Sequence, residues 1–130
     1  MKDLCPPGWP RPKGYSNAMA ARGRVIFTAG VVGWNEQERF EEQTLAGQFA
    51  QALRNIVAIL ACDGAGPSNI ARLTCYVTSI EEYRASAKDI GAAWKAIMGR
   101  HYPAMALVEV VRLVEPEAKV EIEATAVVPE

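Results

Sequence analysis

Residues 102–127 read YPAMALVEVVRLVEPEAKVEIEATAV, and this stretch decides the fold class. It contains two runs, 105–113 and 119–128, with the alternating side-chain pattern of β-strands. The residues on one face of the second run are Val120, Ile122, Ala124 and Ala126. The first run is largely apolar on both faces. Because only a short connector around Pro116 separates the runs, we expect a hairpin-like meander.

Two amphipathic helical patterns lie upstream of this stretch. The first, over 44–61, has an apolar stripe of Leu45, Phe49, Leu53, Ile56 and Leu60. The second reaches about Met98, and its stripe is Tyr83, Ala87, Ile90, Trp94 and Ile97. Ser79 and Glu82 have the spacing of a capping box at its start, and Gly99 is placed to end it. The sequence therefore predicts two helices with one buried face each.

Strand patterns account for most of the remaining chain. IARLTCYVT at 70–78 predicts a strand with Leu73, Cys75 and Val77 on one face. A short strand near 16–21 and a stronger one from Arg24 to about Val32 are expected to form a hairpin. The glycines near the end of the stronger strand suggest a bulge or a close backbone approach. Residues 1–14 are rich in proline and glycine and predict an extended arm.

These elements follow the order β-β-α-β-α-β-β, which predicts an α+β fold with one sheet and both helices on one face. We expect a single domain over residues 1–130. The second face of the sheet is not cleanly polar, as an open face should be. Burial of that face against other copies of the chain would explain it, so the sequence predicts a homo-oligomer.

Composition excludes several classes of protein. The 130 residues include 14 basic and 15 acidic ones and no basic stripe. This composition argues against a nucleic-acid-binding protein. One histidine and three widely spaced cysteines, Cys5, Cys62 and Cys75, do not form a metal-binding pattern or a disulfide framework. No signal-peptide or membrane-spanning pattern occurs. We expect a cytoplasmic protein without a metal site.

The order and spacing of several segments resemble the RidA (YjgF) family of enamine and imine deaminases. They include GYSNA, RVIFTAG, QALRNIVAIL and IARLTCYVTSIEEY, and the opening stretch is the most specific of them. The resemblance covers about Gly14 to Val128. It implies a chorismate-mutase-like fold and a homotrimer in which three sheets form a central barrel with inter-subunit clefts. It also implies hydrolysis of a small reactive imine or enamine to a keto acid and ammonia, without a cofactor.

The same resemblance implies site residues. Glu121 matches the family's proton-handling glutamate, Tyr15 its pocket tyrosine and Gly30 its strand-end glycine, with Ala29 and Val31 beside it. Three other site positions carry Gly91, Met105 and Leu107 in this chain. The family has an arginine, which binds the substrate carboxylate, where this chain has Met105. Methionine donates no hydrogen bond, and loss of such a clamp would cost about 2–5 kcal/mol of binding.

Met105 therefore favours a less polar or larger imine over a standard small α-imino acid. The alternative is a non-catalytic ligand-binding or regulatory trimer. For Tyr15, pocket lining and packing of the arm remain equally open, and Trp34 and Asn35 could line the cleft or cover the core edge. For Glu109 and Glu123 we favour ion pairing with Arg72, Arg112 or Lys119 across strands or subunits. His101 and Cys75 are expected to be structural, the latter buried.

Overall fold

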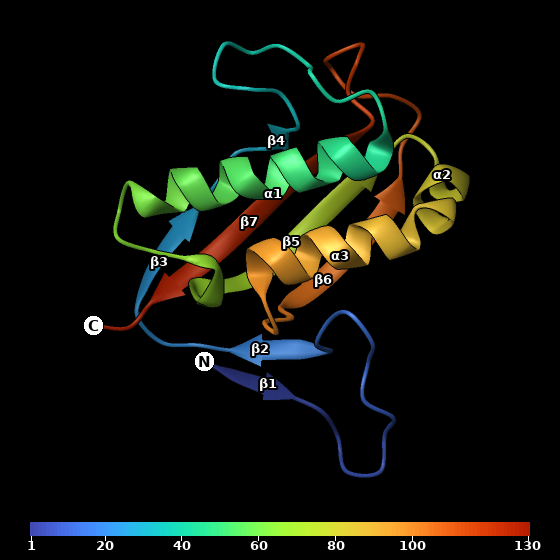
Figure 1. Ribbon diagram of the computed structural model, residues 1–130. Coiled ribbons are helices and arrows are strands. Elements are labelled where there is room, and N and C mark those ends of the chain that lie inside the picture. The colour runs from blue at the N-terminus through green and yellow to red at the C-terminus, as the bar shows by residue number, and fades with distance from the viewer.

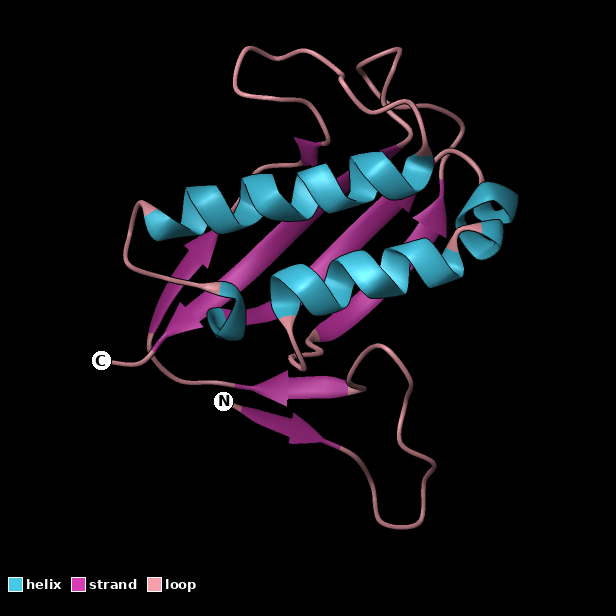
Figure 2. Ribbon diagram, in the orientation of Figure 1, coloured by secondary structure: helices cyan, strands magenta, loops and turns pink.

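A computed structural model describes all of residues 1–130, and it has one layer of helices on one face of a mixed sheet (Figures 1 and 2). The strands are β1 (Lys2–Leu4), β2 (Ala18–Ala20), β3 (Arg24–Phe27), β4 (Val31–Val32), β5 (Ile70–Val77), β6 (Ala104–Glu109) and β7 (Val120–Val128). The helices are α1 (Leu45–Ala61), the 3₁₀ turn η1 (Pro67–Asn69), α2 (Ile80–Ala85) and α3 (Ala87–Met98). The predicted α+β class, with the helices on one face of the sheet, is confirmed.

The main sheet has the strand order β3-β7-β5-β6, and β4 also pairs with β7. The long strand β7 runs antiparallel to all three of its partners, whereas β5 and β6 are parallel. The predicted β6–β7 meander is therefore wrong, because β5 lies between the two strands. The helical crossover through α2 and α3 returns the chain parallel to β5, which places β6 at the sheet edge. The connector around Pro116 then carries the chain past β5 to β7.

The N-terminal hairpin also differs from the prediction. β2 pairs with β1, Lys2 opposite Ala20, and forms a separate two-stranded ribbon below the main sheet in Figure 1. β3 pairs with β7 instead. Gly23 joins β2 to β3 with a φ of 146°, and a Cβ there would lie 2.1 Å from the carbonyl oxygen of Val128. The chain thus passes tightly over the end of β7 at Gly23 and does not reverse. The expected arm at 1–14 contains no helix, as predicted.

Both helical patterns form as expected, with two corrections. Thr44 caps α1 by accepting a hydrogen bond from the amide of Gly47, and the stripe from Leu45 to Leu60 is buried. Ser79 caps α2 in the same way through the amide of Glu82. The capping box is incomplete, because the Glu82 carboxylate accepts instead from the Leu45 amide at 3.0 Å and lies 3.2 Å from Lys119 Nζ. The second helix is also broken at Ser86 into α2 and α3.

The core lies between the helices and the sheet. Leu73, Cys75 and Val77 of β5 are buried there as predicted, with Val120 and Ile122 of β7. The opposite face of the sheet is open in the single chain. Three apolar side chains on it are well exposed: Val25 by 47%, Phe27 by 75% and Val108 by 46%. None of the helices is long and apolar enough to cross a membrane.

Candidate functional site

Glu121 lies on the open face of the sheet, where β7 passes the junction of β3 and β4. Thr28 keeps the junction beside β7: its amide donates to the carbonyl of Ala124, whose amide donates to Thr28 Oγ1, both at 2.9 Å. The junction then brings Gly30 against the acid, so that a Cβ on Gly30 would lie 2.4 Å from Glu121 Oε2. Only glycine fits this approach without moving the carboxylate. The predicted close backbone approach in this segment is therefore present.

The Glu121 carboxylate is half-buried, and no side chain or amide of the chain donates a hydrogen bond to it. Its cross-strand neighbours are Tyr76 on β5 and Val32 on β4. The Tyr76 hydroxyl instead donates to Glu123 Oε1 at 2.7 Å. The hydrogen bond to Glu123 is the main cause that raises the pKa of Tyr76. Glu121 is thus an acid whose lone pairs are free to meet a water or a substrate.

The strand junction also borders a cavity of about 460 Å³, which Glu121 itself does not line. Ala29, Gly30 and Val31 line it from one side, and Asn55 of α1 lines it from the other. Trp34 and Asn35, which the sequence left open between two roles, also line it. Asn55 Nδ2 donates to the carbonyls of Val32 and Trp34, which fixes the loop after β4 to the helix. Three predicted substrate-binding residues therefore meet here.

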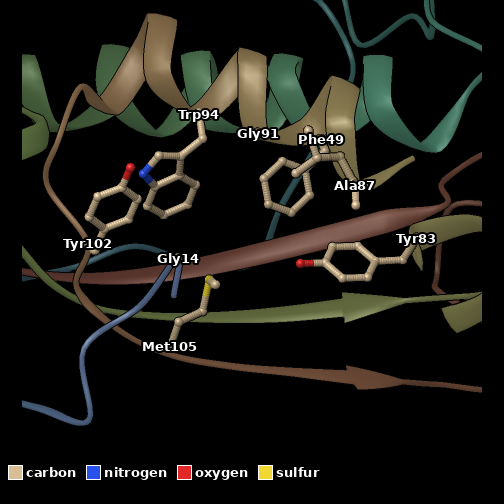
Figure 3. Close-up of a pocket in the computed structure, with 9 residues that line it drawn as sticks. Gly14, Phe49, Tyr83, Ala87, Gly91, Trp94, Tyr102 and Met105 are labelled. Carbon is tan, nitrogen blue, oxygen red and sulfur yellow. The ribbon is translucent and has the colours of Figure 1, made fainter. Parts of the chain in front are cut away.

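Met105 and Gly91 meet in a second cavity, between α3 and the sheet, of about 250 Å³ (Figure 3). Met105 Sδ lies 3.9 Å from the Cys75 thiol, which can donate a weak hydrogen bond to it. Burial raises the pKa of Cys75 to about 12, so the thiol stays protonated and is not a nucleophile. Aromatic rings from α1, α2, α3 and the segment before β6 complete the cavity: Phe49, Tyr83, Trp94 and Tyr102.

Met105 and Glu121 lie on opposite faces of the sheet. In the strand register Met105 is opposite Leu73, and Leu73 is opposite Ala124. These three residues face the helices, where Met105 packs against the core. Glu121 is three positions from Ala124 on β7, so the alternation of the strand turns it to the open face. Within one chain, the sheet itself separates the two ends of the predicted site.

Tyr15 and Leu107 are apart from both cavities described above. Tyr15 is exposed and lines a third, polar cavity with Arg11, Arg100 and His101. Its neighbour Gly14 lines the Met105 cavity, so the arm does reach the site region. Leu107 lies opposite Cys75 in the register and packs against the core. It borders neither the Met105 cavity nor the Gly30 cavity.

The remaining titratable candidates have structural partners. Glu109 accepts from the amide of Ile80 at the start of α2, and Glu123 accepts from Tyr76. Within the single chain neither acid forms an ion pair with a basic side chain, and ion pairs of these acids between subunits stay a prediction. His101 Nε2 lies 2.6 Å from the carbonyl oxygen of Ile70, as suits the expected structural role. No group of three or more His, Cys, Asp or Glu residues could hold a metal ion.

A family model described as Endoribonuclease L-PSP matches residues 10–128. A RutC family protein of Synechocystis is 33% identical over 128 residues, covering 92% of this chain and 91% of that protein. The 2-iminobutanoate/2-iminopropanoate deaminase of Escherichia coli is 31% identical over 108 residues, covering 81% and 80%. A solved structure of a Rid family protein from Yersinia pestis matches with a TM-score of 0.82 and 32% identity, covering 98% of each chain.

The chain belongs to the RidA (YjgF) family. The resemblance in the sequence is therefore confirmed at the level of family. The YjgF gene product of Escherichia coli also shares the fold, with a TM-score of 0.69 and 28% identity.

Sequence reasoning missed the aromatic residues of this RidA family member's second cavity. Tyr83 and Trp94 belong to the apolar stripe of the second helical pattern, which we assigned to the core. The stripe does face inward, but Tyr83 and Trp94 also line open space. One feature of the sequence could have indicated the cavity: a small residue, Gly91, and a flexible one, Met105, both stand at positions expected to bind substrate. Small side chains there leave room that the neighbouring rings do not fill.

Proposed function

We propose that this RidA family member is a hydrolytic deaminase of a reactive imine or enamine, and that Glu121 and a water carry the chemistry. The observation that supports this most is the free carboxylate of Glu121 against the backbone of Gly30. In the proposed reaction Glu121 takes a proton from water as the oxygen adds to the C=N carbon. The proton passes to the nitrogen and gives a carbinolamine. Glu121 then takes the proton of the new hydroxyl group and passes it to the nitrogen as the C–N bond breaks, so that ammonia and a carbonyl compound leave. Backbone amides near Gly30 and along residues 104–107 would orient the substrate.

The proposed site is assembled between subunits. Because Met105 and Glu121 lie on opposite faces of one sheet, one small molecule can contact both only if two copies of the chain contribute. The exposed Val25, Phe27 and Val108 give the open face an apolar surface suited to such association. We propose a homotrimer with three inter-subunit clefts. Light scattering during size-exclusion chromatography should give about three times the chain mass of 14.1 kDa.

The proposed substrate is less polar, or larger, than a small α-imino acid. Relatives named 2-iminobutanoate/2-iminopropanoate deaminase act on small imino acids. In this chain no charged side chain lines the Met105 cavity, so no guanidinium is available there for a carboxylate. A neutral imine or one with a bulky group suits these walls better. Met105, whose side chain is flexible, would serve as an apolar wall.

The test is ammonia release from a panel of imines generated in situ. We expect Glu121→Gln to lower the rate by about 100-fold or more, the usual contribution of a general acid–base group. Glu123→Gln is the matched control, since it lies on the same strand face and its amide can still accept from Tyr76. It should retain most of the activity. Equal rates for wild type and Glu121→Gln on every imine would contradict the proposed function.

A second candidate function is a non-catalytic ligand-binding or regulatory trimer. The observation that favours it is Met105 in the position where the family has its carboxylate-binding arginine. A thermal-shift screen of small metabolites separates the two functions. A ligand that raises the melting temperature and is never converted would favour the binding role.

The family description also includes the word endoribonuclease. With 14 basic and 15 acidic residues, the chain has no excess of positive charge to favour nucleic-acid binding. We therefore propose a small-molecule substrate in the cytoplasm and not RNA. Binding of single-stranded RNA that weakens steeply with added salt would contradict this.

A further inference from the structure

The cavity beside Met105 is uncharged along its whole lining. Its walls include Phe49, Trp94, Tyr102 and Met105, and seven of its nine lining residues are hydrophobic (Figure 3). Trp94 and Tyr102 are stacked, with ring centroids 6.1 Å apart and an angle of 3° between the planes. Trp94 Nε1 is already used, because it donates to the carbonyl of His101. The cavity thus offers flat apolar surfaces and no partner for a charged group.

Its size matches an aromatic ring. A buried apolar cavity of about 150 Å³ is enough to hold benzene, and this cavity has about 250 Å³. Gly91 of α3 contributes to the free space, since a Cβ added there would meet no atom within 4 Å. Tyr102, 39% exposed, borders the cavity, which gives a route from solvent. A six-membered ring with a short substituent would fit this space.

Tyr83 and Tyr102 bring the hydroxyl groups of this cavity. The Tyr83 hydroxyl points into the cavity in Figure 3. The ring of Tyr83 is held against Phe49, with centroids 6.5 Å apart. Burial is the main cause that raises the pKa of Tyr83. The hydroxyl therefore stays protonated and can donate a hydrogen bond at neutral pH.

We infer that this cavity binds an uncharged aromatic ring, that the Tyr83 hydroxyl donates a hydrogen bond to an acceptor on the bound molecule, and that Gly91 sets the size limit. This rests on the proposed function only in that the ring would belong to the imine or enamine substrate. Tyr83 and Gly91 are then specificity-determining residues. The substrate class is a neutral imine or enamine with an aryl group next to a hydrogen-bond acceptor.

Binding of matched probes to the full-length protein tests this without any turnover. Acetophenone has a ring and a carbonyl acceptor, ethylbenzene has the same shape without the acceptor, and benzoate has the ring with a negative charge. We expect acetophenone to bind about threefold to tenfold more tightly than ethylbenzene, the contribution of one neutral hydrogen bond. Benzoate should bind the least tightly of the three. Titrations followed by two-dimensional NMR should shift the indole signal of Trp94.

Two variants assign the effects to residues. Tyr83→Phe should remove the preference for acetophenone and leave ethylbenzene unchanged. Gly91→Leu should weaken both probes by on the order of tenfold or more, because the added side chain occupies the free space. Ala92→Leu is the matched control, since Ala92 is exposed on the same helix and does not line the cavity. It should bind both probes as the wild type does, and melting curves verify that all three variants fold.

The inference is overturned if the ring probes leave Trp94 unshifted, if benzoate binds as tightly as acetophenone, or if Gly91→Leu binds as the wild type does. An unchanged preference in Tyr83→Phe overturns the assignment of the donor. The proposed function fails separately. Release of ammonia from small aliphatic imines without binding of ring probes would sustain the deaminase and refute the aromatic cavity. Binding of ring probes with no ammonia released from any imine would sustain the aromatic cavity and refute the deaminase.

Discussion

The two ends of the candidate site differ in how tightly they are built. At Gly30 the backbone touches the Glu121 carboxylate so closely that a single added carbon would lie 2.4 Å from it. At Gly91 an added carbon would touch nothing. The first end is polar and holds one acid in one place. The second is apolar, lined by rings, and has spare volume.

This difference indicates which end can change during divergence. A glycine under steric contact tolerates no side chain without moving its neighbour, so the arrangement of the acid is constrained. A glycine beside free space tolerates many side chains, so the recognition end can adapt to another substrate at little cost to the fold. Met105, which the sequence resemblance aligns with an arginine of the family, lies at this second end.

The largest effect on deaminase activity is expected from Gly30→Ala. The new methyl group must displace the end of the Glu121 side chain, which is flexible, so the fold should keep its melting temperature. Deaminase activity should fall by about 100-fold, as for loss of a positioned acid–base group. Ammonia release and thermal melting of the same sample measure the two quantities.

Gly33→Ala is the contrasting variant. A Cβ on Gly33 would lie 2.3 Å from the carbonyl oxygen of Gln48, which is helix backbone and cannot swing aside. This variant should lose stability. Full activity in Gly30→Ala would show that Glu121 does not act from its position against Gly30.

A smaller effect, in the opposite direction, is expected from Met105→Arg. A guanidinium at this position could bind a carboxylate through two hydrogen bonds, as proposed for relatives. For a small α-imino acid we expect kcat/KM to rise by about 30-fold, the low end of the value of such a clamp. Met105→Lys is the matched control, because a lysine adds the charge without the two-pronged geometry. An equal gain from both variants would show that charge alone matters.

The sequence predicted the elements better than their partners. The periods of 2 and 3.6 gave the helices and most strands correctly, since side-chain alternation is a local property. Strand neighbours are not local. The runs at 105–113 and 119–128 follow each other in the chain, yet β5 lies between them because the helical crossover must return parallel. The strand predicted near residues 16–21, β2, likewise pairs with β1 and not with β3. No periodic pattern in residues 1–14 predicts the strand β1.

The sequence could predict only those residues of the candidate site that the family resemblance matches one by one. Gly30 and Glu121 were matched by the family resemblance, and the structure places them in contact. The cavity around Met105 depends on residues from α1, α2, α3 and the segment before β6, which no spacing connects. An inward stripe on a helix looks the same whether it fills a core or borders a cavity, so Tyr83 and Trp94 were assigned to the core alone.

The anchoring of the cavity wall gives the next prediction. Glu82 ties the start of α1 to α2, directly before Tyr83, through the Leu45 amide and Lys119. The Leu45 hydrogen bond is the main cause that lowers the pKa of Glu82. A lowered folded-state pKa gives stability that is present above the unfolded value, about 4.3, and is lost as the pH falls through the folded value.

Glu82→Gln should therefore lower the free energy of unfolding by about 0.5–1 kcal/mol at pH 7, a modest value because the side chain is partly exposed. The difference from wild type should shrink as the pH falls below about 4, near the unfolded pKa. Urea denaturation at a series of pH values measures it. Since the Glu121 end does not involve this carboxylate, activity should change less than in Gly30→Ala. A difference that persists unchanged at pH 3 would show that the charge of Glu82 is not its source.

The smallest effect is expected from Gly91→Ala, which should raise the stability of the fold, whereas most substitutions lower it. Alanine in a helix interior is favoured over glycine by about 0.5–1 kcal/mol, and here its methyl group meets no atom within 4 Å. The variant should melt a few degrees higher than the wild type, at about 2–5 °C for a chain of this size. Calorimetry beside Gly30→Ala gives the direct contrast: one glycine whose replacement removes activity at constant stability, and one whose replacement adds stability. A lower melting temperature for Gly91→Ala would mean that the space beside α3 is filled in the assembled protein, and the two ends would then be equally constrained.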